Sequence, residues 1–373
     1  MKPPFPARGW VEIDSAALAH NVSTIRAELG DAVEFCAVVK ADAYGHGVDI
    51  VVPVLQAAGV EVIGVASNAE ADRVRRCGFR GRLIRVRPGA ADEISDGVPL
   101  GIEEWIGGPA HADVVRSVAR RRRRPIASHL SLNSTGLSRD GWDVGAAGEA
   151  DAVRRVFADE SFDIVGVCTH FPREDADDVR RGTARFLLEC SSVAPAKSAV
   201  TRHCATTYAG LHVPESRLDM VRIGAGLYGD TSALDGALRP AMRVLSTVTA
   251  VNSYRRGSSV GYDGWHRLEH DATLALIPLG YADGFHRSLS GRGEVLVRGE
   301  RARIIDRIAM NGFLVDVTRI PGVAPGDEVV LFGRSGAECI TSDDIERSHG
   351  HIAADLYPSW GQLLPRFAVQ PTG

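Results

Sequence analysis

Two alternating patterns of apolar and polar residues run through roughly the first 230 positions. Short, mostly uninterrupted apolar runs predict strands buried on both faces, at residues 33–39, 61–66, 82–87, 125–132, 162–168 and 218–224. Between them, apolar residues recur at helical spacing, at residues 68–77, 111–121, 148–160 and 174–192. Repeated strand-then-helix units predict a parallel sheet, and this many of them suit a (β/α)8 TIM barrel of the α/β class.

The pattern changes after residue 236. Strand-like runs now follow one another, divided by glycine, proline and aspartate turns. These runs cover residues 242–252, 272–279, 293–306, 313–318 and 327–333, and a single short helical candidate covers 342–350. We therefore expect two domains: the barrel over residues 11–236, and a mainly β C-terminal domain over residues 237–373 that also includes residues 1–10.

Composition narrows the classes of function. The 373 residues are 45% hydrophobic and 24% charged, with a formal net charge of -4, which is typical of an ordinary globular protein. This balance gives no general case for binding nucleic acid or an acidic membrane, so a small metabolite is the better default partner. No stretch has the length of a membrane span or the pattern of a signal peptide, which predicts a cytoplasmic protein.

Two features invite over-interpretation. The basic run Arg120–Arg124 follows a helical pattern, has no interleaved aromatic residues and ends at Pro125, so we favour a solvated helix end over a nucleic-acid site. The six cysteines are scattered, with no CxxC pair and no metal-ligand spacing. We expect no metal site and interpret these cysteines as small buried apolar residues.

The segment FCAVVKADAYGHG (residues 35–47) places a charged amine, Lys40, at the end of an apolar strand. In a barrel, this end of a strand is where active sites are built. A lysine amine in a dry or electropositive pocket loses its proton more easily and can form an imine with an aldehyde such as pyridoxal phosphate. From this position alone, a salt-bridged structural lysine is the favoured interpretation.

The run AVVKADAYGHG (residues 37–47) resembles the cofactor-lysine signature of the alanine racemase family, which has pyridoxal-phosphate fold type III. The resemblance continues through almost the whole chain. It implies that pyridoxal 5'-phosphate is attached to Lys40. It also implies further cofactor contacts by Tyr44, Arg139, His170, His203, Thr206, Thr207, Arg222, Gly224 and Ala225.

Several motifs carry these implied roles. By resemblance, Arg139 in LSRDG contacts the phenolic oxygen of the cofactor and the substrate carboxylate, and His170 in VGVCTHF stacks on the pyridine ring. Arg222 in LDMVRIGAGLYGD faces the pyridine nitrogen, and His203 belongs to a hydrogen-bonded chain behind it. A permanent cation in that place disfavours protonation of the nitrogen and so suppresses side reactions such as transamination.

The resemblance also extends into the β domain. Tyr281 in IPLGYADGFHR takes the place of a second catalytic base, and Met310 in RIAMNGFLVDVT lies in a loop that contacts the substrate carboxylate. In the family the tyrosine enters from the partner subunit, which implies a homodimer with Tyr281 and Met310 supplied across the interface. Racemisation needs a base on each face of Cα, and Lys40 and Tyr281 would serve one face each. Hydrogen bonds from Tyr281 through His170 to Arg222 would favour the phenolate.

Some positions depart from the usual alanine racemase pattern. HLSLNSTG has Ser131 where the family often has a carbamylated lysine. This variant, with THFPRED, LHVPESRLDMVR and VGYDGW, resembles the broad-specificity amino-acid racemases. Those relatives can hold an anion near the arginine, partly through an asparagine. Asp140 takes that place in this chain, and its charge would repel chloride.

Other departures bear on the substrate pocket. Gln362 stands where alanine racemases have a tyrosine, with Trp360 two residues earlier, and Asn311 replaces an aspartate at the entrance. Losing that tyrosine ring should widen the pocket, and Asn311 should make the entrance less acidic. Together these changes predict an amino-acid racemase, interconverting L- and D-amino acids, whose substrate is larger than alanine.

Three alternatives remain open on the sequence: alanine racemase proper, another reaction on the same cofactor and barrel, and a cofactor carrier without catalysis. Decarboxylases of this fold place an acid opposite the pyridine nitrogen, so Arg222 argues against them. A carrier would lack the second domain, so the domain with Tyr281 argues against that alternative.

Overall fold

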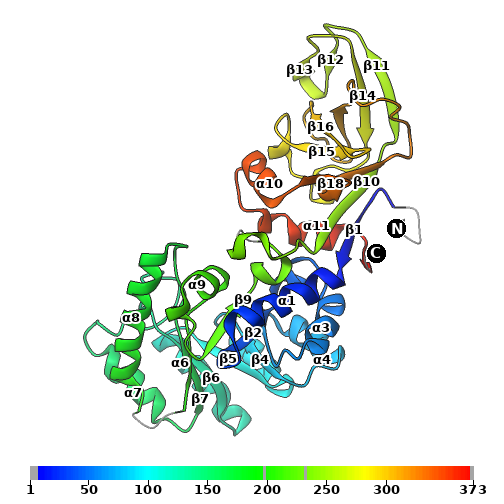
Figure 1. Ribbon diagram of the computed structural model, residues 1–373. Helices are drawn as coiled ribbons and strands as arrows, with labels where there is room; N and C mark the ends of the chain where they lie inside the picture. The colour runs from blue at the N-terminus through cyan, green and yellow to red at the C-terminus, as the bar shows by residue number, and fades with distance from the viewer. Residues whose placement is uncertain (1–6, 196–198, 231–232, 370–373) are drawn as a thin grey trace. The chain divides into compact units, whose positions relative to one another are not determined.

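The computed structural model describes residues 7–195, 199–230 and 233–369. The chain forms two compact units. The barrel unit comprises residues 18–43 and 51–239, and the β unit comprises residues 1–17, 44–50 and 240–373. Figure 1 shows the elements of both.

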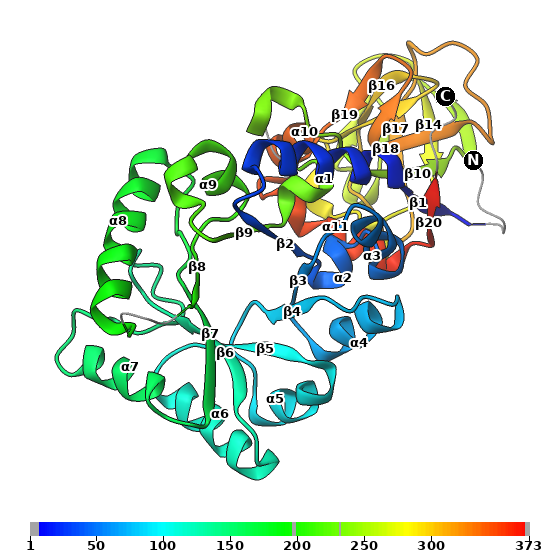
Figure 2. The ribbon, with the colours of Figure 1, turned by 60° about the horizontal axis from the view of Figure 1, so that its bottom comes forward.

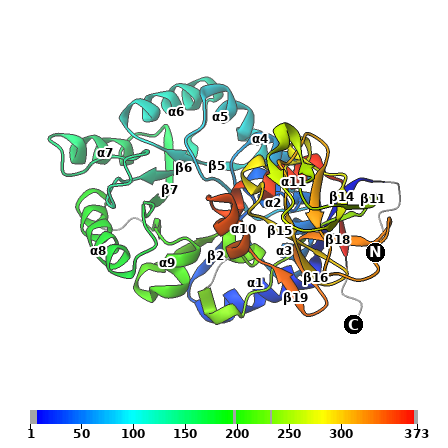
Figure 3. The same cartoon turned by 90° about the horizontal axis from the view of Figure 1, so that it is seen from above.

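The barrel unit is built on eight parallel strands in the order β8-β7-β6-β5-β4-β3-β2-β9 (Figure 2). Figure 3 shows β5, β6 and β7 of this sheet, with the helices outside them, from above. Backbone hydrogen bonds between the β8 and β9 segments bring the two ends of this sheet together, so the barrel is nearly closed and the predicted fold is confirmed. The strands are β2 (Glu34–Val38), β3 (Val62–Val65), β4 (Arg82–Arg85), β5 (Ile102–Ile106), β6 (Ile126–Ser131), β7 (Phe162–Cys168), β8 (Thr201–His203) and β9 (Met220–Ile223).

Helices cover the outside of the ring of strands, as Figure 2 shows for α4 to α9. Their apolar sides pack on the outer face of the strands and exclude water from it, and most strand residues are buried, which is why most of these strands are nearly continuous apolar runs. The helices are α1 (Ser15–Leu29), α3 (Val48–Ala57), α4 (Asn68–Arg76), α5 (Ala91–Gly97), α6 (Pro109–Arg122), α7 (Glu149–Phe157), α8 (Ala176–Val193) and α9 (Thr207–His212). Arg120–Arg124 are exposed at the end of α6, as expected for a solvated helix end.

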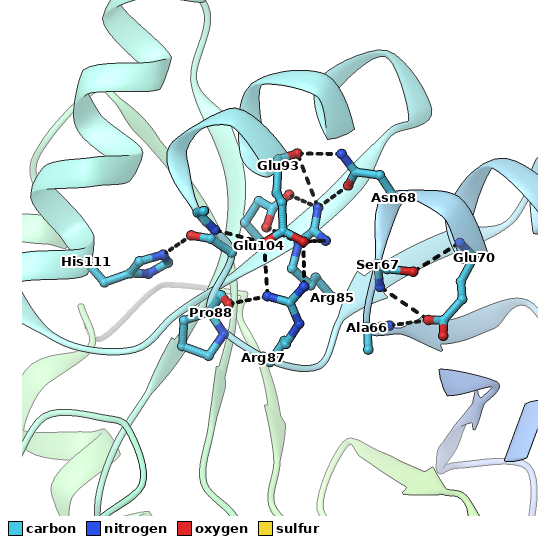
Figure 4. A network of polar contacts seen from close by, with 12 residues as sticks. Ala66, Ser67, Asn68, Glu70, Arg85, Arg87, Pro88, Glu93, Glu104 and His111 are labelled. Carbon is cyan, nitrogen blue, oxygen red and sulfur yellow. Dashed lines mark hydrogen bonds and ion pairs between the residues drawn. The ribbon is translucent and has the colours of Figure 1, made fainter. Parts of the chain in front are cut away.

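Strands β5 and β8 were not among the strands predicted from apolar runs. β8 is only three residues long, and β5 carries the consecutive acids Glu103 and Glu104. Glu104 faces the helices, where it accepts hydrogen bonds from Arg85 Nε at 2.7 Å and Nη2 at 3.1 Å (Figure 4). Arg85 also donates to Asn68 at the start of α4. In β5, the buried ion pair between Arg85 and Glu104 therefore takes the place of the apolar contacts by which a buried strand is normally predicted from sequence.

The β unit contains a mostly antiparallel sheet in the order β11-β14-β17-β16-β15-β18-β10-β1-β20, with β19 paired to β18. Its strands are β1 (Gly9–Asp14), β10 (Met242–Thr247), β11 (Ala250–Tyr254), β14 (Ala272–Ile277), β15 (Glu294–Val297), β16 (Glu300–Ile304), β17 (Phe313–Asp316), β18 (Glu328–Ser335), β19 (Glu338–Ile340) and β20 (Arg366–Val369). A separate hairpin joins β12 (Ser259–Val260) and β13 (His266–Arg267). The mainly β character of this unit agrees with the sequence.

Two details of the β unit differ from expectation. Residues 11–14, which we assigned to the barrel, lie in β1 and pair with β10 and β20. Besides the expected helix α10 (Ser342–His349), a second helix, α11 (Tyr357–Leu363), is present. Pro358 lies in its first turn, where the missing N–H costs no hydrogen bond, so proline marked the start of a helix rather than a turn.

Candidate active site

Lys40 opens a left-handed turn directly after β2. Segment α2 (Lys40–Tyr44) has positive φ angles of 53°, 55°, 56° and 52° at Ala41, Asp42, Ala43 and Tyr44. Each L-residue in this conformation costs about 1–2 kcal/mol, so four in succession make a strained segment. Backbone strain of this kind persists where surrounding contacts over-determine it, and it clusters at functional sites.

Contacts from helix α4 hold this turn. The Asp42 carboxylate pairs with Arg73 at 2.7 Å, and the Asp42 N–H donates to Glu70 Oε1 at 3.4 Å. The other oxygen of Glu70 accepts hydrogen bonds from the backbone amides of Ala66 and Ser67. Figure 4 shows these two contacts. Glu70 therefore ties the lysine turn to the first turn of α4.

The surroundings of Lys40 shift its amine toward the neutral form. The residue is exposed, yet protein atoms surround the amine closely enough that burial is the largest cause lowering its pKa below the usual value. The positive charges of Arg139 and Arg222 lower this pKa further, while Glu70 opposes them. A neutral amine is the form that can attack a carbonyl or accept a proton.

Arg222 lies buried at the third position of β9. Its Nη1 donates to His203 Nδ1 at 2.6 Å and to the His203 carbonyl at 3.0 Å. Its Nη2 donates to the carbonyls of Thr169 at 2.9 Å and Cys204 at 3.2 Å, and lies 3.4 Å from His170 Nδ1. The guanidinium is thus fixed by neutral partners. Burial lowers the pKa of Arg222 below its usual value, but a guanidinium stays protonated in proteins, so Arg222 brings a positive charge into the barrel interior.

His170 follows β7 and is half-buried. Burial, then the charges of Arg222, Arg139 and Lys40, lower the pKa of His170 to about 3. The imidazole is therefore neutral near pH 7. These mutual electrostatic effects show that the structure brings together four of the predicted residues, Lys40, Arg139, His170 and Arg222, from four separate barrel segments.

Asp140 provides the acid beside Arg139. Its Oδ1 accepts from Ser131 Oγ at 2.7 Å and from Trp105 Nε1 at 3.1 Å, and its Oδ2 accepts from Arg139 Nε at 3.1 Å. Burial alone would raise the pKa of Asp140, but these hydrogen bonds and the Arg139 charge bring it below its usual range. The predicted negative charge is present, and it is a partner of Arg139. The indole of Trp105 also lies against the Arg222 guanidinium, 5.4 Å from ring centre to Cζ.

The remaining predicted cofactor residues of the barrel unit lie after β8 and β9. Thr206 precedes the first residue of α9, and Thr207 is buried with its hydroxyl accepting from the Gly226 amide at 3.2 Å. Gly224 and Ala225 begin the 3-10 turn η3 (Ala225–Tyr228). A Cβ at Gly226 would lie 2.9 Å from Thr207 Cγ2, so glycine is needed for this approach. Hydroxyls and chain turns of this kind suit a phosphate group.

In the β unit, Tyr281 and Met310 lie on two joined turns. The Tyr281 N–H donates to the Ala309 carbonyl and the Ala282 N–H to the Met310 carbonyl, both at 3.1 Å. Tyr281, Met310 and Asn311 are exposed, and the Arg287 guanidinium lies 6.0 Å from the centre of the Tyr281 ring. Tyr44 also belongs to this unit and is half-buried.

Trp360 does not lie where the sequence suggested. Its side chain is fully buried in the β unit, where it packs against Phe332 and Tyr357. This burial leaves no surface for a substrate, so Trp360 is a core residue. Gln362, two residues later on α11, is exposed.

Sequence reasoning missed a set of polar residues behind His203. His203 Nε2 lies 2.9 Å from His129 Nδ1, and His129 Nε2 lies 2.8 Å from Glu103 Oε2. Glu103 in turn pairs with Arg82. The signal was present, because His129 is a titratable side chain in the buried strand β6, but a single polar residue in a strand does not reveal its partners on other strands.

Within the parts of the chain that the structure describes, no group of three or more His, Cys, Asp or Glu residues is arranged to hold a metal ion. No helix in those parts is both long and apolar enough to cross a membrane.

Comparison with known protein families shows which family has this sequence and fold. Residues 13–232 match the N-terminal domain of alanine racemase, and residues 241–368 match its C-terminal domain. The chain belongs to the alanine racemase family. Within this family, a broad specificity amino-acid racemase from Pseudomonas taetrolens is 42% identical over 96% of this chain and 89% of its own length. A lysine racemase from Proteus mirabilis is 37% identical over 99% of this chain and 91% of its own length.

A solved alanine racemase from Bartonella henselae shares the fold. It superposes with a TM-score of 0.86 at 24% identity, covering 98% of this chain and all of its own. That structure contains covalently bound pyridoxal phosphate.

Proposed function

We propose that this member of the alanine racemase family is a pyridoxal-phosphate-dependent amino-acid racemase whose substrates include amino acids larger than alanine. The observation that carries the proposal is the cluster of a lysine with a lowered pKa, two arginines and a neutral histidine at the carboxyl ends of barrel strands. Amino-acid racemases at 37–42% identity support the same reaction class.

The donors in the barrel unit fit pyridoxal phosphate. Lys40 would hold it covalently, Arg222 would face its pyridine nitrogen, and Thr206, Thr207 and the turn at Ala225 would hold its phosphate. When bound, this cofactor withdraws electrons from the substrate Cα and makes the Cα proton acidic. Arg222 cannot give up its proton, so it supplies a constant positive charge beside the ring.

Two side chains would move the proton at Cα. The neutral Lys40 amine would take or return it on one face, and the Tyr281 hydroxyl on the other. Arg139, held by Asp140, would bind the substrate carboxylate together with the Met310 turn. Because Lys40 and Tyr281 belong to different units, we further propose that Tyr281 reaches the site from the partner subunit of a homodimer. The cytoplasmic location stays a prediction.

The proposed substrate class rests on two exposed residues of the β unit. Gln362 and Asn311 are both exposed. Gln362 is less bulky than the tyrosine common in alanine racemases, and Asn311 lacks the negative charge of the aspartate common there. Measuring kcat/KM for L-alanine, serine, lysine, arginine and methionine tests this part of the proposal. We expect comparable or higher values for the longer side chains. A strong preference for alanine would show that the pocket is not widened.

The reaction itself is tested by incubating the holoenzyme with an L-amino acid in D2O. We expect deuterium at Cα together with loss of optical rotation, since each proton removed is replaced from solvent. Protein that binds the cofactor but gives no exchange would instead be a carrier. Exchange with release of CO2 would indicate a decarboxylase.

A further inference from the structure

A chain of polar side chains crosses the interior of the barrel behind Arg222. It starts at Arg222 and His203, near the carboxyl ends of β9 and β8, and passes through His129 on β6 to Glu103 near the amino end of β5. The successive distances are 2.6, 2.9 and 2.8 Å. His129 and His203 are completely buried and Arg222 is 3% exposed, so these three side chains are shielded from bulk water, while the Glu103 side chain is 13% exposed.

The direction of every hydrogen bond in this chain follows from its first member. A guanidinium cannot accept a hydrogen bond, so Arg222 Nη1 donates and His203 Nδ1 accepts with its lone pair. His203 then carries its proton on Nε2, which donates to His129 Nδ1. By the same reasoning His129 carries its proton on Nε2 and donates to Glu103. The reverse direction would require an imidazolate anion in a buried site.

The charges are consistent with this order. Burial alone would raise the pKa of Glu103, but hydrogen bonds from His129 and Arg82 hold it at about 2. Burial is the largest cause lowering the pKa of both His129 and His203, so both rings are neutral. The chain therefore has a cation at one end, an anion at the other and two aligned neutral imidazoles between them. Such aligned hydrogen bonds polarise and strengthen one another.

The fold makes room for the His129 ring. A Cβ at Gly166 of the adjacent strand β7 would lie only 2.1 Å from His129 Nδ1 and 2.7 Å from its Cε1. Any larger residue at this position would displace the imidazole from the chain. Gly166 thus makes space for the buried imidazole of His129, a polar ring that does not contribute to an apolar core.

We propose that His129 and Glu103 are positioning residues that lock His203 in its Nε2–H tautomer and thereby fix Arg222 within the site. The functional part of this proposal rests on the function proposed above. If Glu103 lost its charge, His129 Nε2–H would face a weaker neutral acceptor, or a donor in its place, so the tautomers of His129 and His203 would be fixed less firmly. Arg222 would then hold its place less rigidly beside the cofactor ring.

The first test reads the tautomers directly. In 15N-histidine-labelled protein, with and without cofactor, we expect His129 and His203 to show an unprotonated Nδ1 and a protonated Nε2 throughout the neutral pH range. Difference spectra with His129→Asn and His203→Asn assign the signals. An Nδ1–H tautomer or an imidazolium at either ring would overturn the proposal, whatever the enzyme catalyses.

The second test removes the anion. Glu103→Gln should lower kcat by about tenfold to a hundredfold with little change in KM, the size of effect that a hydrogen bond to a charged group carries. The visible absorption of the bound cofactor and the tautomer signals should change with it. Glu34→Gln is the matched control, because Glu34 pairs with the same Arg82 at 2.8 Å but does not touch His129. We expect its kcat to stay within about twofold of the parent enzyme.

A third variant covers the case in which Glu103→Gln does not fold. Gly166→Ala displaces the His129 ring without altering any charge, and it should produce the same spectral change and loss of kcat. If the parent enzyme racemises amino acids and both variants behave like Glu34→Gln, the positioning role is wrong. If the parent protein shows the expected tautomers but no racemisation, the proposed function fails while the tautomer assignment stands.

Discussion

Asp140 shows how much a single residue depends on what surrounds it. From the sequence, we interpreted Ser131 as the replacement of a lysine and Asp140 as a negative charge that would repel chloride. In the structure, the Ser131 hydroxyl and the Trp105 indole both donate to the Asp140 carboxylate, whose second oxygen accepts from Arg139. The departures at Ser131 and Asp140 are therefore complementary. The Ser131 hydroxyl donates a hydrogen bond to Asp140, and Asp140 in turn orients Arg139.

This arrangement predicts that Asp140 is needed for substrate binding. Asp140→Ala should raise KM for amino acids by about tenfold or more, because Arg139 loses a charge-assisted hydrogen bond that fixes its direction. Three donors would then surround the space left by the carboxylate. Added formate should therefore lower KM again in the variant, as steady-state kinetics with and without formate would show.

The control for this experiment is Asp143→Ala, which removes an exposed carboxylate three residues away. Its KM should match that of the parent enzyme, with no response to formate. An unchanged KM in Asp140→Ala would mean that Arg139 keeps its position without the acid.

Among the elements, the left-handed turn Ala41–Tyr44 is the one that local preferences argue against most strongly. Alanine, aspartate and tyrosine all prefer right-handed backbone, and no glycine lies among these four positions. The turn exists because Asp42 is held by Arg73 and Glu70, which come from another part of the chain. Apolar patterns predicted most of the longer strands and the helices α4, α6, α7, α8 and α10, whereas other elements escaped; among these, a buried ion pair disguised β5 and a helix-starting proline disguised α11.

The strain in this turn predicts an unusual response to glycine. Ala41→Gly should be neutral or stabilising in urea-induced unfolding, since relief of about 1–2 kcal/mol of left-handed strain offsets the greater freedom that glycine gives the unfolded chain. The same change at Ala184, exposed in the middle of α8, should cost about 1 kcal/mol. Equal losses at the two positions would mean that Ala41 is not strained.

For the whole molecule, the residues proposed for the two faces of Cα are divided between two compact units. Lys40 belongs to the barrel unit, and Tyr281 to the β unit. Neither unit by itself contains both proposed bases. We propose that each active site combines Lys40 of one copy of the chain with Tyr281 of a second copy.

Mixing inactive subunits tests this proposal. Lys40→Ala and Tyr281→Phe homodimers should each racemise slowly or not at all. If each site combines Lys40 of one copy with Tyr281 of the other, a mixed dimer has one intact site, and random exchange should restore about a quarter of the parent activity. Mixtures of either variant with itself are the controls. No recovery in mixed dimers confirmed by mass would place both bases in one chain.

The sequence by itself determined the class of the fold and the candidate chemistry. Strand and helix periodicity predicts a barrel, because each strand and helix leaves its own local apolar pattern, and the run around Lys40 resembles a cofactor-lysine signature that lies within one short segment. Only the tertiary structure decided the arrangement around Arg222. The ordered chain through His203, His129 and Glu103 joins residues from four strands, and the partner of Arg139 was visible only once Ser131, Trp105 and Asp140 met. Hydrogen-bond direction and burial depend on which side chains meet in space, and spacing along the chain does not encode this.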